Sequence, residues 1–97
     1  MYFVVLNIDR PDGGGIRQRL RAEHRTYIHG DLGPATLRLA GPLLAQDEET
    51  MIGSLLVVEA ANRELVERIV QNDPFCQAGL FASSTIHGWH WMTGIPR

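Results

Sequence analysis

The chain has 97 residues, a mass of 10.8 kDa and a hydrophobic content of 44%, which describe one small globular domain over residues 1–97. Eleven acidic side chains and nine basic ones give a formal net charge of −2, and every basic residue is arginine because the sequence holds no lysine. The lack of lysine excludes Schiff-base chemistry and a P-loop phosphate site. The low charge argues against nucleic acid or an anionic membrane as partner and favours a small molecule or a protein.

The single cysteine, Cys76, has no partner for a disulfide within the chain, which favours a reducing, cytoplasmic location. The apolar start, residues 1–6, lacks a cationic leader and is soon followed by Asn7 and Asp9, so we interpret it as a strand and not as a signal peptide. No apolar run approaches the roughly 20 residues that cross a bilayer. We therefore expect no membrane contact.

The first half of the chain predicts a strand, a helix and a second strand. Residues 2–8 are aromatic and β-branched, and the turn formers that follow, residues 9–15, predict a mobile glycine-rich loop. From Ile16 the apolar spacing becomes helical, and the helix ends near Gly30. Residues 37–44 predict a strand at the sheet edge, since Gly41 and Pro42 interrupt it.

The second half predicts a strand, a helix and a last strand. The polar connection at residues 46–50 leads into an apolar strand over 51–59. Asn62 supplies an N-cap for a helix that Pro74 ends near Asp73. Residues 81–92 are β-branched and aromatic, and alternation places one set of them on a common face: Phe81, Ser83, Thr85, His87, Trp89 and Trp91.

The resulting order, β-α-β-β-α-β, predicts an α+β, ferredoxin-like fold with a four-stranded antiparallel sheet. Right-handed crossovers place strands 2–8 and 51–59 at the centre of the sheet and both helices on one of its faces. Both central strands are apolar on both sides. The uncovered face would therefore expose a large apolar patch, and we expect a homodimer formed by packing sheet on sheet.

Two polar residues are predicted to lie on the sheet-facing sides of the helices. His24 is in register with Leu20 and Ile28, and Asp73 follows Val70 at the end of the second helix. A carboxylate that holds one imidazole nitrogen leaves the other as a general base. The alternative interpretation is structural: a hydrogen-bonded core histidine and an aspartate that ends a helix before proline.

Several short segments, in their order and spacing, resemble the YciI-related family over nearly the whole chain. They are residues 21–27 around His24, 39–44 with Gly41-Pro42, 53–55, the Asp73-Pro74-Phe75 segment with 78–81, and 86–89. The sequence departs from many relatives at Gly88, where they have proline. The resemblance implies the dimeric α+β barrel fold, with a His-Asp pair in a cleft near the dimer interface. Carried over residue by residue, that pair is His24 and Asp73.

The resemblance also implies a function, because one characterised relative eliminates chloride from a chlorinated hydroxyquinol without a cofactor. We therefore expect a small enzyme with no cofactor, which uses His24 and Asp73 for proton transfer on a hydroxylated aromatic or lactone-like substrate. The alternative is a non-catalytic dimeric module that binds a small ligand. Candidate substrate-binding residues are Ser54, a hydrogen-bond donor from the third strand, Tyr27, and the ring-stacking pair His87 and Trp89, which otherwise fill the dimer interface.

Two further patterns are interpreted without a function. No pair among the four histidines has the i, i+4 helical spacing of a zinc motif, so we expect no metal site. The arginines at 17, 21 and 25 form a stripe at helical spacing that would steer an anion toward His24, but a solvated helix face explains it without function.

An RNA-binding interpretation fails because the central strands lack aromatic residues set among basic ones.

Overall fold

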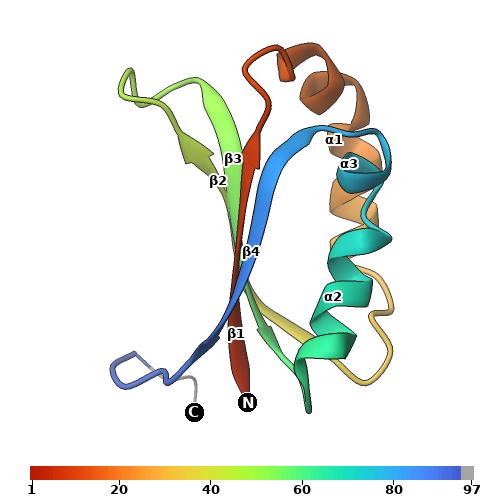
Figure 1. The fold of residues 1–97 in the computed structure, drawn as a ribbon, viewed down its shortest axis with the longest axis vertical. Coiled ribbons are helices and arrows are strands. Elements are labelled where there is room, and N and C mark those ends of the chain that lie inside the picture. Colours follow the sequence, from red (N-terminus) through yellow and green to blue (C-terminus); the bar gives the residue numbers. More distant parts are fainter. Residues whose placement is uncertain (95–97) are drawn as a thin grey trace.

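The computed structural model describes residues 1–94 as a four-stranded antiparallel sheet with helices on one face (Figure 1). The spatial order of the strands is β2-β3-β1-β4, which confirms the predicted α+β, ferredoxin-like fold and the central position of β1 and β3. A one-turn helix, α3, was not predicted from the sequence. In chain order the elements are β1 (Tyr2–Asp9), α1 (Gly14–Ile28), β2 (Thr36–Leu44), β3 (Met51–Glu59), α2 (Arg63–Gln71), α3 (Pro74–Gln77) and β4 (Phe81–Trp89).

The core lies between the sheet and the helices. Phe3 and Val5 of β1 pair with Val58 and Leu56 of β3, and all four are at most 3% exposed. They pack against the apolar stripe of α2 and the end of α1, which contribute Val66, Ile69, Val70 and Ile28. Asn62 caps α2 as predicted, because its side chain accepts a hydrogen bond from the Leu65 amide at 3.1 Å.

Helix α1 begins earlier than its apolar spacing suggests. Gly14 and Gly15 form its first turn, so the interpretation of the three glycines as a mobile loop is wrong. Gly13 is buried at the N-cap position, and a β-carbon there would lie 2.5 Å from Cδ1 of Leu80. A side chain at position 13 would therefore press on the buried side chain of Leu80 and on the carbonyl oxygen of Arg10, 3.0 Å away, which favours glycine there.

Strand β4 differs from its predicted form at both ends. It stops at Trp89, so Trp91 lies outside it. A register shift next to Ile8 pairs Phe81 with Asp9 instead of continuing the alternation from Ser83. Phe81 consequently faces the helices, with its ring 6.2 Å from that of Phe75, and its predicted placement beside Ser83 is wrong.

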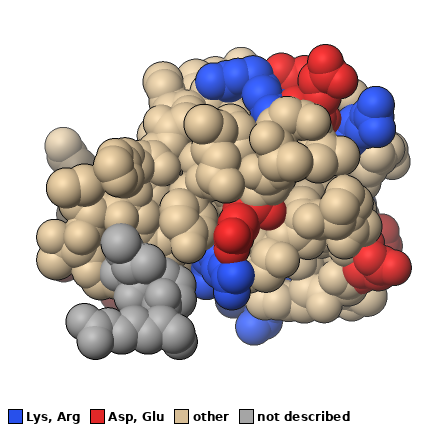
Figure 2. Space-filling model, turned by 90° about the horizontal axis from the view of Figure 1, so that it is seen from below, with Lys and Arg blue, Asp and Glu red and all other residues tan. Residues whose placement is uncertain are grey.

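The second face of the sheet carries no helix in the described part of the chain (Figure 1). By strand register it presents Val4, Leu6, Leu55 and Val57. Three large apolar side chains on this face are 38 to 47% exposed, namely Ile8, Leu39 and Trp89. Figure 2 views the molecule from below, with this face of the sheet on the left side of the picture. Outside the atoms drawn in grey, the residues seen on that side are tan, which means that they are uncharged. We call this surface the open face.

Within residues 1–94 no helix is long and apolar enough to span a membrane.

Candidate active site between the first helix and the sheet

His24 and Asp73 form a buried pair that joins α1 to the start of α3. Nδ1 of His24 lies 2.9 Å from Oδ1 and 2.8 Å from Oδ2 of Asp73, and the two residues are 7% and 2% exposed. The sequence after Asp73 fixes its position. Because Pro74 follows, Asp73 is extended, with φ −65° and ψ 130°, and its Oδ1 accepts a hydrogen bond from the amide of Phe75 at 2.9 Å.

This contact determines which imidazole nitrogen carries the hydrogen. An ionised carboxylate only accepts hydrogen bonds, so Nδ1 of His24 donates to Asp73 and Nε2 of the neutral ring is an unprotonated acceptor. Nε2 has no hydrogen-bond partner in residues 1–94. Since no buried side-chain nitrogen or oxygen in that part of the chain lacks a partner, Nε2 is accessible to solvent. His24 thus presents a basic lone pair to solvent.

A cavity of about 160 Å³ lies beside His24, between α1 and strands β2 and β3. Strand β2 borders it with Gly41 and Pro42, and β3 with Ser54 and Leu56. Three arginines of α1 line it as well, at positions 17, 21 and 25. The cavity therefore brings together two histidines, His24 and His29, a hydroxyl and three arginines.

A small polar network orients Ser54 in the floor of the cavity. The side-chain amide of Asn7 donates to Oγ of Ser54 at 3.3 Å, and the hydroxyl of Ser84 donates to Oδ1 of Asn7 at 2.6 Å. Next to Ser54, a β-carbon on Gly53 would lie 2.2 Å from the carbonyl oxygen of Asn7. Glycine therefore allows β3 to approach β1 closely here, and Ser54, as an acceptor from Asn7, keeps its own hydrogen available.

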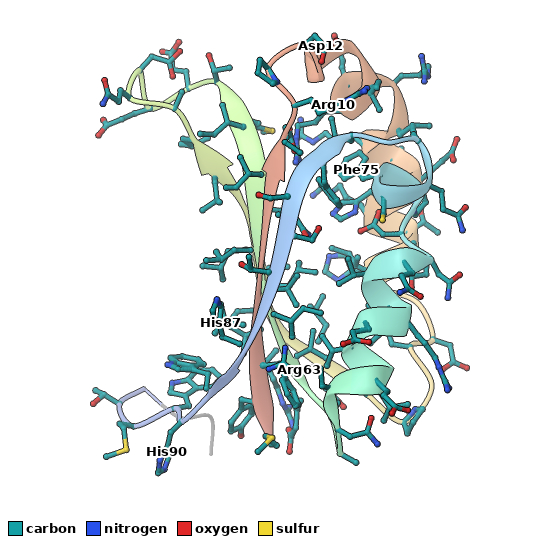
Figure 3. All side chains as sticks on the ribbon, viewed as in Figure 1. Arg10, Asp12, Arg63, Phe75, His87 and His90 are labelled. Carbon is teal, nitrogen blue, oxygen red and sulfur yellow. The ribbon has the colours of Figure 1, made fainter. Side chains whose placement is uncertain are left out.

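Phe75 and Arg17 complete the wall behind His24, and neither was predicted to lie there. The rings of Phe75 and His24 are stacked, with centroids 4.2 Å apart and planes 13° apart, and Cζ of Arg17 lies 4.7 Å from the Phe75 centroid. Figure 3 shows Phe75 in the layer between α1 and the sheet. The sequence around position 75 has no helical or strand periodicity that would predict a buried ring there. Only the place of Phe75 directly after Asp73-Pro74 indicates that it lies near His24.

The interpretation of the arginine stripe as wholly solvated is wrong for Arg17. This residue is 7% exposed and donates two hydrogen bonds to Asp9, at 2.6 Å from Nε and 2.8 Å from Nη2. Arg21 and Arg25 are exposed, as expected. One arginine of the stripe therefore belongs to the core, and two lie at the mouth of the cavity.

The remaining candidates lie elsewhere. Tyr27 is half-buried and does not border the cavity; its hydroxyl donates to the carbonyl oxygen of Ile69 at 2.7 Å and so ties α1 to α2. Burial, and secondly the charge of Asp73, raises the pKa of Tyr27 above its usual value of 10.0. His87 and Trp89 lie on the open face, so the sheet separates them from His24 within one chain (Figure 3).

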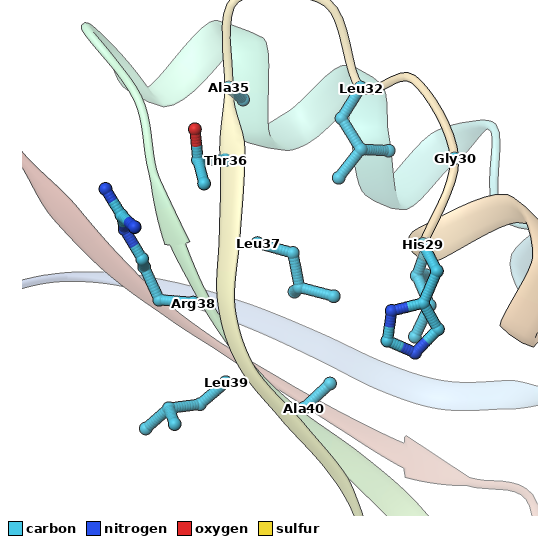
Figure 4. Close-up of a pocket in the computed structure, with 10 residues that line it drawn as sticks. His29, Gly30, Leu32, Ala35, Thr36, Leu37, Arg38, Leu39 and Ala40 are labelled. Atoms are coloured by element: carbon cyan, nitrogen blue, oxygen red, sulfur yellow. The ribbon is translucent and has the colours of Figure 1, made fainter. Parts of the chain in front are cut away.

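A second hollow, of about 330 Å³, lies along the edge strand β2 and the segment after α1 (Figure 4). It meets the first cavity at Ile28, His29 and Ala40, which line both. Its other lining is mostly apolar, and its one arginine, Arg38, is paired with Glu59. Across residues 1–94 no group of three His, Cys, Asp or Glu side chains is arranged to hold a metal ion.

Comparison with known proteins shows similarity in sequence and in fold. The sequence matches the YCII-related domain over residues 1–90. Among solved structures it is similar to the 5-chloro-2-hydroxyhydroquinone dehydrochlorinase of Burkholderia phenoliruptrix AC1100, in a complex with 2,5-dihydroxybenzoquinone. The identity is 33% and the TM-score 0.80, and the match covers 93% of this chain and 94% of that chain. A comparison with curated proteins found no match.

Proposed function

Since this chain belongs to the YCII-related domain family, we propose that it is a small cofactor-independent enzyme that transfers protons on a hydroxylated aromatic or lactone-like substrate. The observation that carries the proposal is the accessibility of Nε2 of His24, next to a cavity of about 160 Å³, while Nδ1 is held by Asp73. The similar dehydrochlorinase, which is named for 5-chloro-2-hydroxyhydroquinone, a hydroxylated ring, supports this substrate class.

In the proposed reaction Nε2 of His24 takes a proton from a ring hydroxyl. The electron pair of the broken O–H bond forms a ring C=O bond. In an elimination the displaced ring electrons first take the proton back from the imidazolium at the carbon that carries the leaving group, such as chloride, and this carbon becomes tetrahedral. A second ring hydroxyl then gives its proton to Nε2, its electron pair forms a second C=O bond, and the shifted ring double bond expels the leaving group with its bonding pair. In an isomerisation the imidazolium returns the proton to a ring carbon. Both versions are general acid–base catalysis by one histidine, and neither needs a redox partner.

Asp73 and Ser54 support this step in different ways. Asp73 is at hydrogen-bonding distance from Nδ1 and would stabilise the imidazolium that forms when Nε2 takes the proton. Ser54, which accepts from Asn7, would donate its free hydrogen to the developing ring oxyanion. Tyr27 would act indirectly, by fixing α1 against α2.

We further propose that the protein is a cytoplasmic homodimer joined through the open face. Three large apolar side chains of this face, Ile8, Leu39 and Trp89, are 38 to 47% exposed, and an exposed apolar patch of this kind marks an interface. His87 and Trp89 would then contact the partner subunit instead of the cavity of their own chain. The lone cysteine, Cys76, is compatible with a reducing compartment.

The alternative remains a non-catalytic module in which the His24–Asp73 pair only ties α1 to α3. It is favoured by one observation, the double use of the Asp73 carboxylate as helix cap and histidine partner. The two functions differ in the role of Nε2. It accepts a proton in the enzyme, and it has no role if the pair only holds α1 and α3 together. Variants that keep the fold but change His24 therefore distinguish them.

The test is turnover of a chlorinated hydroxyquinol and of a muconolactone, followed by chloride release and by absorbance. The variants are His24→Gln, Asp73→Asn and, as a histidine control outside the cavity, His90→Gln. We expect wild type and His90→Gln to be equally active and the other two to lose a factor of about 10²–10⁴. Equal activity in all four proteins would remove His24 and Asp73 from the mechanism, and no turnover of any tested ring substrate by wild type would favour the non-catalytic module.

A further inference from the structure

Two arginines at the mouth of the His24 cavity have no acidic partner in the described part of the chain. Arg21 and Arg25 line the cavity and are exposed. Ion pairs within residues 1–94 engage Arg10, Arg17, His24 and Arg38, but neither Arg21 nor Arg25. These two guanidiniums are therefore available to a ligand in the cavity.

The acids near this cavity are already engaged. Asp9 is bonded through both oxygens to Arg17, and Asp73 is bonded to His24. None of the described residues that line the cavity is itself acidic. The positive charge of Arg21 and Arg25 is thus not balanced from within the site.

The spacing of the two arginines makes this arrangement unfavourable for the fold alone. Residues four apart on a helix are neighbours, and like charges at this spacing repel and destabilise the helix. Asp9 relieves the repulsion at Arg17 but has no counterpart at Arg21 and Arg25. A bound anion would supply the missing charge, and a guanidinium fork suits the paired oxygens of a carboxylate or a charged ring oxygen.

We propose that the cavity takes its substrate as an anion, a single ring with a negatively charged oxygen group held by Arg21 and Arg25 beside Nε2 of His24. This rests on the proposed function, whose substrate class it narrows. The cavity of about 160 Å³ is large enough for a single ring, since a cavity of about 150 Å³ in a protein core binds benzene. The charge resides on an ionised ring hydroxyl or on a ring carboxylate.

Binding of three probes tests the proposal without requiring turnover. 2,5-Dihydroxybenzoquinone is a vinylogous acid and carries ionised ring oxygens at neutral pH, benzoate carries a carboxylate, and 2,5-dimethoxybenzoquinone is a neutral analogue. The proteins are wild type, Arg21→Gln/Arg25→Gln, the control Arg19→Gln from an exposed position of α1 outside the cavity, and His24→Gln. Calorimetric titration at low salt, repeated at high salt, gives the dissociation constants.

We expect wild type to bind at least one anion about tenfold or more tightly than the neutral quinone, with the affinity falling as salt is raised. The double variant should lose about tenfold or more for that anion, while Arg19→Gln stays within about twofold. The preferred anion identifies the source of the charge. Equal binding of charged and neutral probes, unchanged binding by the double variant, or no binding of either anion would overturn the proposal.

The same experiment separates this inference from the proposed function. His24→Gln should bind the anion yet fail in turnover if both are right. Anion binding that depends on Arg21 and Arg25, in a protein that turns over no ring substrate, would support the anion site and contradict the proposed enzyme function. Turnover that is unchanged in the Arg21→Gln/Arg25→Gln variant would support the enzyme function and contradict the anion site.

Discussion

Asp73 contacts Nδ1 of His24 with both carboxylate oxygens, at 2.9 and 2.8 Å, and with one of them it also caps α3 through the amide of Phe75. One side chain therefore orients the imidazole and begins the helix that carries Phe75, the ring stacked on that imidazole. The position of the base and the position of its wall depend on the same carboxylate. Changes at Asp73 should consequently affect the site more than the fold.

The substitution Asp73→Asn separates charge from capping. Asparagine caps helices about as well as aspartate, so α3 should persist, while the ring loses the negative charge that favours hydrogen on Nδ1. We expect turnover to fall by a factor of about 10²–10⁴. The free energy of unfolding should fall by about 1–3 kcal/mol, as for a weakened buried hydrogen bond, in urea titrations. Unchanged turnover with lowered stability would assign Asp73 to structure alone.

The glycines at the start of α1 predict opposite effects from the same substitution. Gly13→Ala should destabilise the protein by about 1–3 kcal/mol, because its β-carbon would meet Leu80 at 2.5 Å. Gly15→Ala is the matched control, since nothing lies within 4 Å of its added carbon and alanine favours the helix, so a gain of about 0.5–1 kcal/mol is expected. Thermal unfolding of both variants measures the difference. A loss at both positions would contradict the early start of α1.

The contribution of Tyr27 to the free energy of unfolding should fall at high pH. Burial raises its pKa above 10.0 in the folded protein, so its contribution is fully present below pH 10 and is lost as the pH rises from 10 through the folded pKa. Tyr27→Phe removes the hydrogen bond to Ile69 and should cost about 0.5–1.5 kcal/mol at neutral pH. Urea titrations of both proteins from pH 7 to 11 should show the difference shrinking above pH 10. A constant difference would mean that Tyr27 does not titrate with unfolding.

The open face predicts how the protein assembles. Ile8 lies on this face, in central strand β1, and is 40% exposed, so Ile8→Glu should be tolerated by a single chain. In a dimer joined by this face it would bury an unpaired charge, and we expect a monomer by sedimentation at concentrations where wild type is dimeric. Gln18→Glu, on α1, controls for the added charge and should remain dimeric. A monomeric wild type would refute the proposed interface.

Sequence patterns were sufficient for the element order and the central strands, because each follows from a regular period. The approach of Asp73 to His24 was also predicted, but the placement of Asp73 on the stripe of the second helix was wrong, since α2 ends at Gln71 and Asp73 is extended before Pro74. Arg17 was not predictable in the same way. Its spacing from Arg21 suggested a solvated stripe, and its partner Asp9 comes from a different element across the connection that begins α1. Phe81 was misplaced because a register shift of one residue reverses the face of a side chain, and no residue type announced the shift. Contacts between elements, rather than periods within them, determined these positions.

The most direct test of the account observes the two ring nitrogens of His24 by nuclear magnetic resonance, in protein labelled with ¹⁵N-histidine. In the neutral ring we predict hydrogen on Nδ1 and a bare Nε2 whose resonance moves when 2,5-dihydroxybenzoquinone is added, while the resonances of His90 stay in place. Hydrogen on Nε2, or an Nε2 resonance that does not move at saturating ligand, would contradict the assignment of His24 as the base that faces the substrate.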